Sequence, residues 1–302
     1  MTANLLTLET LQQRLELAPE LGGGITRWDW RGPKGPTPLL RPWDGVADDC
    51  YTLACFPLTP WSNRISHGGF AQDGVLYPVA PNRAGEPYPI HGDGWLQAWR
   101  VTDSAPERIR LELESHHFRA SPYAFHSTQT CELLPNGLAI DLSVTHLGDQ
   151  PLPYGLGLHP YFTCDAQTRL RMRTRGIWLS GKDPLPVTHT SAFPPSADYN
   201  APAPLSGPLL DHCYTGWDGE AIIEHPTHGL RLRLGTEDCN GYSLIYRPPG
   251  LGYFCLEPIT HPIDAFHLPG RPGLVLLSQG ATLRLRVSLT VSPLTGSDSL
   301  TS

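Results

Sequence analysis

Five polar side chains lie beside glycines, prolines or hydrophobic runs rather than on surfaces with a solvent-facing pattern. They are Arg64, His91, His159, Asp211 and Glu257. Imidazole and carboxylate groups often transfer protons in enzymes, and arginine binds ligand oxygen atoms. Each also has a structural alternative, such as a core hydrogen bond, a buried ion pair or a contact that braces a loop. The set indicates acid–base chemistry if the fold brings its members together.

The segment 154–162 gives His159 its context. Leu156 and Leu158 alternate with glycines, which is typical of a buried strand whose one face allows a backbone or a ligand to come close. Pro160 cannot donate to a sheet, so we expect His159 at or near the last paired position, with the chain bending away after it. An imidazole there would suit proton transfer in a sugar-sized cleft, and a hydrogen bond to a core carbonyl is the alternative.

Glu257 follows a hydrophobic run, residues 253–256, and precedes Pro258, which we expect to end the strand as Pro160 does after His159. Apolar surroundings raise the pKa of a carboxyl group, toward values that suit a general base near neutral pH. A buried ion pair with an arginine is the alternative for this glutamate.

Composition narrows the classes of function. The chain has 302 residues, a net charge of −7 and 22 lysines and arginines that form no runs, which argues against a nucleic-acid surface and favours neutral ligands. It shows neither an apolar run of about 18 residues nor a secretory signal, so we expect a cytoplasmic protein without a membrane role. Seven scattered cysteines without a C-x-x-C pair suggest neither a disulfide framework nor a zinc site.

The elements that must position these residues are short strands, because 30 glycines and 32 prolines leave little room for long helices. Hairpin turns are expected at Asp73-Gly74 and at 135–137. The long loop 188–208 could line a site or act as a lid, or it could be a surface insertion. We predict an all-β fold, a single large antiparallel β-sandwich over residues 1–302 with a frayed tail at 293–302. The expected strands are 13–17, 26–30, 108–112, 128–134, 138–146, 221–224, 230–234, 242–246, 254–256, 274–277 and 281–291.

Five short motifs occur in an order and spacing that resemble those of the aldose 1-epimerase, or galactose mutarotase-like, family. The resemblance covers nearly the whole chain and implies one large β-supersandwich with a sugar cleft across its concave face. The motifs are Asn63-Arg64-Ile65, His91-Gly92, Gly157-Leu158-His159-Pro160-Tyr161-Phe162, Leu210-Asp211-His212 and Leu256-Glu257-Pro258.

The resemblance also implies roles. Glu257 would be the general base that takes the anomeric hydroxyl proton, and His159 the general acid that protonates the ring oxygen, so that the sugar opens to its aldehyde. No cofactor and no metal would be needed, because only two protons move, and the partner would be a free aldose bound by a monomer or homodimer. The residues that would bind the sugar are Asn63, Arg64, His91, Tyr161 and Asp211.

One position departs from the family pattern. Many members have a glutamine on the strand before the glutamate, where this chain has Leu244. One sugar contact would therefore be lost or replaced, which leaves the preference between galactose and glucose open.

Four other functions remain as alternatives. A hexose-6-phosphate mutarotase would need a cationic clamp, for which Arg64, Arg83 and Arg247 are the candidates. A glycoside hydrolase could use Asp211 with Glu257 but would leave His159 without a role. A metal site of His91, His159 and Glu257 lacks short ligand spacings. A non-catalytic sugar-binding protein would not require both His159 and Glu257.

Overall fold

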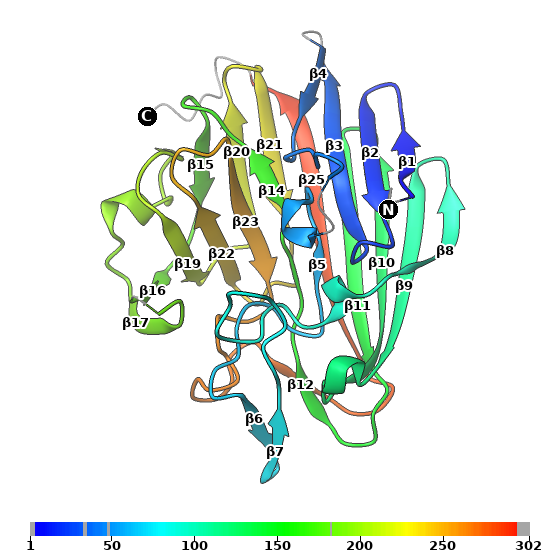
Figure 1. Cartoon of the computed structure of the whole chain (residues 1–302). Helices are drawn as coiled ribbons and strands as arrows, with labels where there is room; N and C mark the ends of the chain where they lie inside the picture. The colour runs from blue at the N-terminus through cyan, green and yellow to red at the C-terminus, as the bar shows by residue number, and fades with distance from the viewer. Residues whose placement is uncertain (1–3, 33–34, 47–48, 182, 295–302) are drawn as a thin grey trace.

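The computed structural model describes residues 4–32, 35–46, 49–181 and 183–294, and it consists of antiparallel sheets stacked in layers (Figure 1). No α-helix occurs among these residues. The helical turns are η1 (Cys50–Thr52), η2 (Gly94–Leu96), η3 (Phe118–Ala120) and η4 (Pro195–Ala197). The all-β prediction is therefore confirmed.

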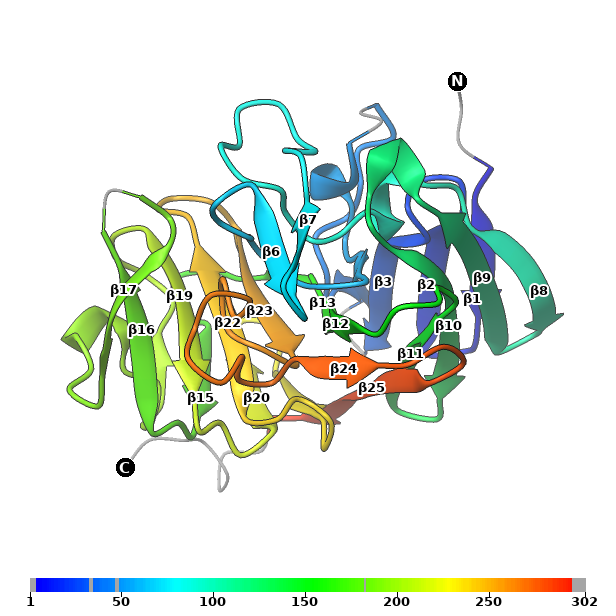
Figure 2. The same cartoon turned by 90° about the horizontal axis from the view of Figure 1, so that it is seen from below.

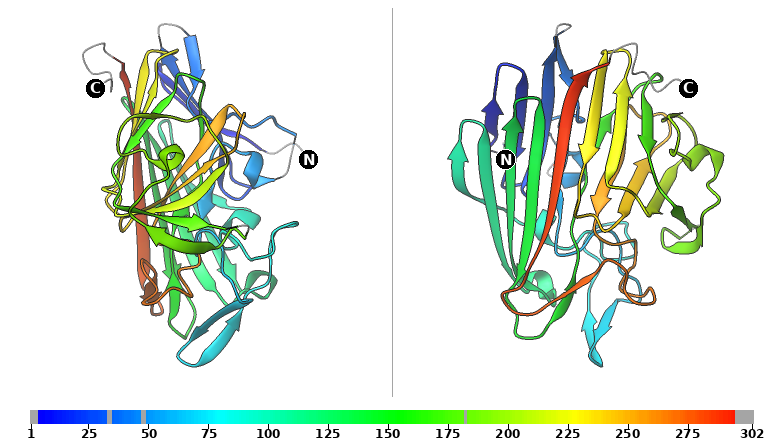
Figure 3. Two further views of the ribbon diagram at one scale, coloured as in Figure 1. Left: turned by 90° about the vertical axis from the view of Figure 1, so that its left-hand side faces the viewer. Right: turned by 180° about the vertical axis from the view of Figure 1, so that it is seen from behind.

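One layer is a nine-stranded sheet, seen face-on from behind in Figure 3. Its strand β25 (Thr282–Pro293) shows why it forms: Leu285, Val287 and Leu289 are buried, whereas Arg284 and Arg286, which alternate with them, are exposed. This period of two gives the sheet one apolar and one polar face. The other strands, in sheet order, are β18 (Ala203–Pro204), β15 (Arg169–Met172), β20 (Glu220–His225), β21 (Leu230–Gly235), then β25, β11 (Gly137–His146), β10 (Ala124–Leu134), β9 (Arg108–His116) and β8 (Arg100–Ala105).

The second layer joins an eight-stranded and a four-stranded sheet, which isolated bridges connect at Ile25 with Cys55 and at Leu40 with Phe162. The larger sheet has the order β17 (Pro186–Thr190), β16 (Gly176–Ser180), β19 (Leu210–Thr215), β22 (Tyr242–Arg247), β23 (Tyr253–Ile259), β13 (Gly157–Leu158) and β5 (Pro57–Leu58), with β14 (Tyr161–Thr163) also paired to β23. The smaller sheet is β1 (Leu6–Glu9), β2 (Gln13–Ala18), β3 (Gly24–Gly32) and β4 (Gly35–Pro38).

The alternation along β23 separates the core from the site. Phe254 and Leu256 belong to the main hydrophobic core, whereas Cys255 and Ile259 belong to a second apolar cluster. Because successive side chains of a strand point to opposite faces, Glu257 points to the same side as Cys255, away from the main core. That side of the sheet is covered by the chain that follows β7, residues 79–93 (Figure 2).

Both predicted hairpins form. Asp73-Gly74 joins β6 (Gly69–Gln72) to β7 (Val75–Pro78), and the turn after Leu134 joins β10 to β11. The segment 154–162, by contrast, is divided among three strands: β12 (Leu152–Tyr154), which pairs with β24 (Val275–Leu277), β13 and β14. His159 follows the last residue of β13, as predicted, and its backbone N–H donates to the carbonyl of Phe56 at 3.0 Å.

The predicted strand end at Glu257 is wrong. The pairing of β23 with β22 continues through Pro258, opposite Ser243, to Ile259, opposite Tyr242. Thr260 donates its N–H to Leu156, on the β13 side. Backbone donors alternate in direction along a strand, so the nitrogen of Pro258 faces the same side as that of Thr260. On that side the pairing with β13 has ended and the pairing with β14 has not begun, so the missing N–H of the proline costs no ladder hydrogen bond. The proline therefore does not interrupt the ladder with β22.

The predicted frayed tail at 293–302 is corrected at its start. Pro293 pairs with Leu230 at the end of β25, and Leu294 donates its N–H to Gly229. The remainder of the predicted tail, residues 295–302, lies outside the described residues.

The segment 188–208 is a fixed part of the sandwich edge. It begins within β17 and includes η4 and β18. The buried guanidinium of Arg247 donates to the carbonyls of Ser196 and Pro208 and to the hydroxyl of Tyr199. No residue of the segment lines the cavity described below, so the segment does not form a wall of it.

Candidate active site

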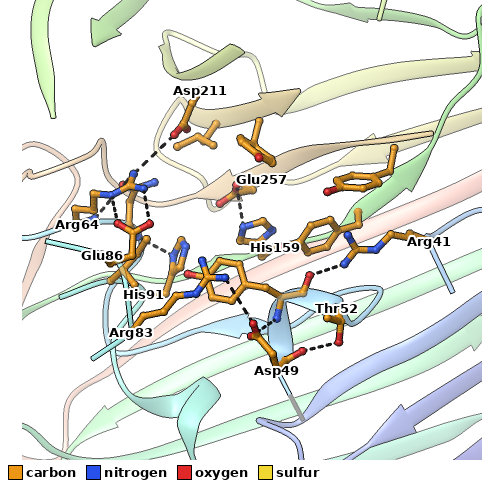
Figure 4. Close-up of a pocket in the computed structure, with 17 residues that line it drawn as sticks. Arg41, Asp49, Thr52, Arg64, Arg83, Glu86, His91, His159, Asp211 and Glu257 are labelled. Atoms are coloured by element: carbon orange, nitrogen blue, oxygen red, sulfur yellow. Dashed lines mark hydrogen bonds and ion pairs between the residues drawn. The ribbon is translucent and has the colours of Figure 1, made fainter. Parts of the chain in front are cut away.

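A cavity of about 430 Å³ lies over the eight-stranded sheet (Figure 4). Its volume suits a small ligand. The seven residues that the sequence singled out all line it, although their roles stay predictions. The lining residues are Arg41, Asp49, Tyr51, Thr52, Asn63, Arg64, Arg83, Glu86, Ile90, His91, His159, Tyr161, Asp211, Leu244, Tyr246, Tyr253 and Glu257.

His159 and Glu257 contact each other in the buried part of this cavity. The Nε2 atom of His159 lies 3.5 Å from Oε1 of Glu257, and their side chains are only 6% and 2% exposed. Nδ1 of His159 and Oε2 of Glu257 have no hydrogen-bond partner among the described residues. The break between β13 and β14 leaves room for the histidine beside β23. The pair thus retains donor and acceptor capacity for a ligand.

Aromatic rings fix the orientation of the His159 imidazole. It is stacked between Phe56 and Tyr161, with ring centroids 4.8 Å and 4.7 Å away. The guanidinium of Arg41 lies 3.8 Å from the centroid of the Tyr161 ring and adds a fourth group to this stack. A ring held between two others can present only its edge, which carries the nitrogen atoms, to a neighbour.

Burial shifts the two pKa values in opposite directions. It lowers the pKa of His159 to about 3, assisted by the positive charge of Arg41. It raises the pKa of Glu257 well above the ordinary value, assisted by the negative charge of Asp211. Desolvation disfavours the charged form of each group, so burial favours a neutral imidazole beside a protonated carboxyl group, and a single proton then serves the pair. Such a pair can accept one proton while it donates another.

The backbone fixes the tautomer of His91. Its Nδ1 accepts the N–H of Asn63 at 3.0 Å, so in the neutral ring the proton is on Nε2. Burial lowers the pKa of His91 well below the ordinary value, and a nearby His159 lowers it further. The imidazole rings of His91 and His159 meet edge to face at 5.3 Å. His91 is therefore a neutral donor next to the buried pair.

Arg64 is held by two carboxylates. Its Nε and Nη2 atoms donate to Oε2 and Oε1 of Glu86 at 3.1 and 3.2 Å, and Nη1 lies 3.8 Å from Oδ2 of Asp211 (Figure 4). Nη1 also donates to Oδ1 of Asn63 at 3.3 Å. Sequence reasoning missed Glu86, because it lies in a proline-rich segment without a motif. Its two-point contact offsets the positive charge of Arg64.

The segment around η1 forms a further wall that the sequence did not indicate. Oδ1 of Asp49 accepts the N–H of Tyr51 at 3.0 Å, and the guanidinium of Arg83 lies 3.4 Å from the centroid of the Tyr51 ring. That ring is 5.9 Å from the His159 ring and 6.0 Å from the His91 ring. Tyr51 thus places its ring beside both histidines, and its hydroxyl is buried without a partner in the described part of the chain.

The arginines that line the cavity differ from those considered for a phosphate clamp. Of the three arginines considered for a phosphate clamp, Arg64 and Arg83 line the cavity, but Arg247 does not, because it is buried against the segment 195–208. Arg41, which was not considered, does line it. Leu244 also lines the cavity and is paired directly opposite Glu257 in the β22–β23 ladder.

Two other kinds of feature are absent from the described residues. Within residues 4–294, apart from the gaps noted above, no three histidine, cysteine, aspartate or glutamate side chains could jointly hold a metal ion. No helix among the same residues has the length and apolar character needed to cross a membrane.

Comparisons with known proteins identify the class and then the family. Solved structures of galactose mutarotase-like proteins share this fold. One of them, described as a GalM/aldose epimerase homologue from C. elegans, aligns with a TM-score of 0.81 and 17% sequence identity. The alignment covers 97% of this chain and 100% of that chain. The model of the aldose 1-epimerase family matches residues 5–290. The chain belongs to the aldose 1-epimerase family.

Two matches in Escherichia coli K12 are more similar in sequence. The uncharacterized protein YphB is 34% identical over 296 residues, which cover 95% of this chain and 99% of that protein. A crystal structure described as that of a candidate aldose 1-epimerase has a TM-score of 0.90 and 31% identity, over 96% of this chain and 99% of its own. The similarity therefore extends over essentially the full length of both chains.

Proposed function

We propose that the protein is a mutarotase that interconverts the α and β anomers of a free aldohexose. The observation that carries this proposal is the contact between His159 and Glu257, 3.5 Å apart in the buried part of a polar cavity. Their shared proton matches a reaction that removes one proton and supplies another. Membership in the aldose 1-epimerase family supports the same reaction.

In the proposed mechanism the single proton of the pair first passes from Glu257 to His159, and ionised Glu257 then takes the proton of the anomeric hydroxyl. The bond between C1 and the ring oxygen breaks, the carbonyl forms at C1, and protonated His159 gives its proton to the ring oxygen. Rotation about the C1–C2 bond then presents the other face of the aldehyde. Ring closure returns both protons and yields the other anomer.

The remaining cavity residues would bind the sugar. Nε2–H of His91 is a donor suited to the ring oxygen or the anomeric oxygen, and Arg64 with Asn63 supplies further donors. The side chain of Asp211 is 29% exposed and can accept hydrogen bonds from hydroxyl groups farther from C1. Tyr161 acts differently from the others, since its ring stacks on His159 and fixes the general acid.

The charges that line the cavity favour a neutral sugar over a sugar phosphate. Arg64 is bonded at two points to Glu86, and Arg83 lies 3.6 Å from a carboxylate oxygen of Asp49. A phosphate dianion would have to compete with these carboxylates for the guanidinium groups of Arg64 and Arg83. We therefore infer that kcat/KM is higher for free aldoses than for their 6-phosphates.

The test is proton NMR of freshly dissolved α-D-glucose and α-D-galactose, each with and without the protein. The proposal expects the β anomer to appear faster with protein present. A higher kcat/KM for the 6-phosphates would assign the protein to the phosphorylated substrates instead. Saturable sugar binding without any acceleration would make it a carbohydrate-binding protein.

A further inference from the structure

A second cavity, of about 330 Å³, is lined by residues from the same chain segments that provide walls of the first cavity. Trp61 lines it two residues before Asn63, Asp93 lines it two residues after His91, and Arg83 lines both cavities. The side chain of Asn82 fixes the shared wall, because it bonds the backbone of Ile90 at 2.8 and 2.9 Å and that of Gly92 at 2.7 Å. The second cavity is thus adjacent to the candidate active site but separate from it.

The second cavity has a different chemical character. Much of its lining is apolar, in contrast to the charged walls of the first cavity. The apolar lining residues are Val79, Ala80, Pro81, Ala84, Leu96 and Phe118, beside the ring of Trp61. The polar and charged ones are Asn82, Arg83, Asp93, Arg119 and Ser121. A pocket that is mainly apolar with a few polar groups is typical of binding sites for small organic molecules.

Two of its buried polar atoms lack hydrogen-bond partners within the described residues. They are the indole Nε1 of Trp61, a donor, and the carboxylate Oδ2 of Asp93, an acceptor. The two residues are only 1% and 5% exposed. Buried polar atoms in folded proteins nearly always find a partner, which can be an ordered water or a ligand.

The carboxylate of Asp93 is held in place by its other oxygen. Oδ1 accepts from Nε2 of Gln97 at 3.2 Å, and Gln97 also donates to Oγ of Ser115 at 3.0 Å. Burial raises the pKa of Asp93 to about 7, although the nearby side chains of Ser121 and Gln97 lower it. The carboxylate is therefore fixed in position through Oδ1, with Ser121 as a further hydrogen-bond donor beside it.

One wall of the cavity has strained backbone. Around η3, the φ angles of His117, Arg119 and Ala120 are 50°, 48° and 64°, which is left-handed backbone without glycine. Such conformations are costly and cluster at ligand-binding sites and switch regions. Phe118 and Arg119 from this segment line the cavity, and the guanidinium of Arg119 lies 5.0 Å from the centroid of the Phe118 ring.

We propose that this cavity is a second binding site, which takes a small, neutral, largely apolar molecule with a hydroxyl group. A hydroxyl both donates and accepts, so it can donate to Asp93 Oδ2 or accept from Trp61 Nε1. The apolar remainder of the ligand lies against Val79, Leu96 and Phe118. A sugar fits this lining poorly, because most of its hydroxyl groups would be left without partners. The inference does not depend on the reaction proposed for the first cavity.

The experiment uses the whole protein with phenol as the probe and toluene as the matched molecule without a hydroxyl. The readout is the indole N–H resonance of Trp61 in 15N-labelled protein, assigned by comparison with Trp61→Phe. We expect phenol to shift this resonance saturably. Toluene should bind about fivefold more weakly than phenol, because it lacks the one net hydrogen bond that the hydroxyl group forms. Asp93→Leu, which removes the acceptor but keeps the size, should weaken phenol binding to the level of toluene.

Competition separates the two cavities. Excess glucose should leave the phenol-induced shift unchanged, because glucose belongs in the other cavity. Toluene binding as tightly as phenol, displacement of phenol by glucose, or a Trp61 resonance that phenol does not move would each overturn the proposal. If Trp61→Phe does not fold, a crystal structure of the unaltered protein soaked in phenol decides the matter by showing either phenol or only water beside Asp93.

Discussion

The imidazole of His261 fills the space beside Gly155 so closely that a Cβ atom on residue 155 would lie 2.0 Å from Cδ2 of His261. The sequence indicated that a backbone or a ligand would approach these glycines, and at Gly155 the neighbour is instead a buried side chain. Nε2 of His261 accepts the N–H of Ser62 at 3.0 Å, next to the Asn63 and Arg64 of the cavity. The glycine thus allows a histidine to support the loop of the candidate active site.

Gly155→Ala should destabilise the protein, because the new methyl group must displace a ring that has no space to move into. Overpacking of this kind costs about 1–3 kcal/mol of unfolding free energy. Urea denaturation measures the effect. Gly252→Ala is the matched control, since its Cβ would meet nothing closer than a carbonyl oxygen at 3.7 Å. Equal stability of the two variants would show that His261 is not packed as described.

Acid should destabilise the fold through buried histidines. Burial lowers the pKa of both His261 and His225 to about 4, below the value of 6.5 for a free imidazole. Their contribution to stability is therefore complete above pH 6.5 and is lost as the pH falls through the folded-state pKa near 4. At pH 5 the loss is about 2 kcal/mol for each group.

Urea denaturation at pH 7 and pH 5 checks this expectation, with His225→Gln as the comparison because His225 lies outside the cavity. The variant should show a smaller difference between the two pH values, by about 2 kcal/mol. An unchanged difference would mean that His225 is not buried in its neutral form.

The pH profile of kcat/KM should reflect the shared proton of His159 and Glu257. A second proton joins the pair only near the lowered pKa of His159, about 3, and the single proton leaves only at the raised pKa of Glu257. Between these values the fraction of active protein is constant. We expect kcat/KM for α-D-glucose not to fall between pH 7 and pH 5. A tenfold fall per pH unit below 6.5 would instead indicate a histidine with an ordinary pKa.

Tyr51→Phe should separate binding from stability. The Tyr51 hydroxyl is buried without a partner among the described residues, so its removal should leave the unfolding free energy unchanged or raise it. If the hydroxyl bonds to the sugar, KM should rise about fivefold to tenfold. Tyr199→Phe is the control outside the cavity: it removes a bond from Arg247, so stability should fall and KM should not change. An unaltered KM in Tyr51→Phe would remove Tyr51 from the sugar-binding set.

The sequence predicted those features of the fold that depend on local pattern. Alternation and turn dipeptides correctly predicted the β6–β7 and β10–β11 hairpins, because a hairpin is specified by residues next to each other in the chain. The strand end at Glu257 was wrong because the effect of Pro258 depends on which neighbouring strand its nitrogen faces, and that is a property of the assembled sheet.

In the candidate site, too, the sequence predicted the residues that lie in motifs but not those that only the folded structure brings together. His159, Glu257 and the five residues expected to bind the sugar all line one cavity. Tyr51 and Glu86 were missed because they lie in irregular segments, and only the packing of η1 and of residues 79–93 over the eight-stranded sheet brings them there. Arg247 was considered for a role in the site, yet its charge serves to fix the segment 195–208.

The comparison of Glu257→Gln with Asp211→Asn tests the central claim most directly, by measuring kcat and KM for the interconversion of glucose anomers. Glutamine keeps the shape of the side chain but removes the base, so kcat should fall by roughly two to four orders of magnitude with little change in KM. Asp211→Asn removes only a group that binds hydroxyls, and it should raise KM more than it lowers kcat. A near-normal kcat in Glu257→Gln together with an inactive Asp211→Asn would contradict the account, because the base would then be Asp211.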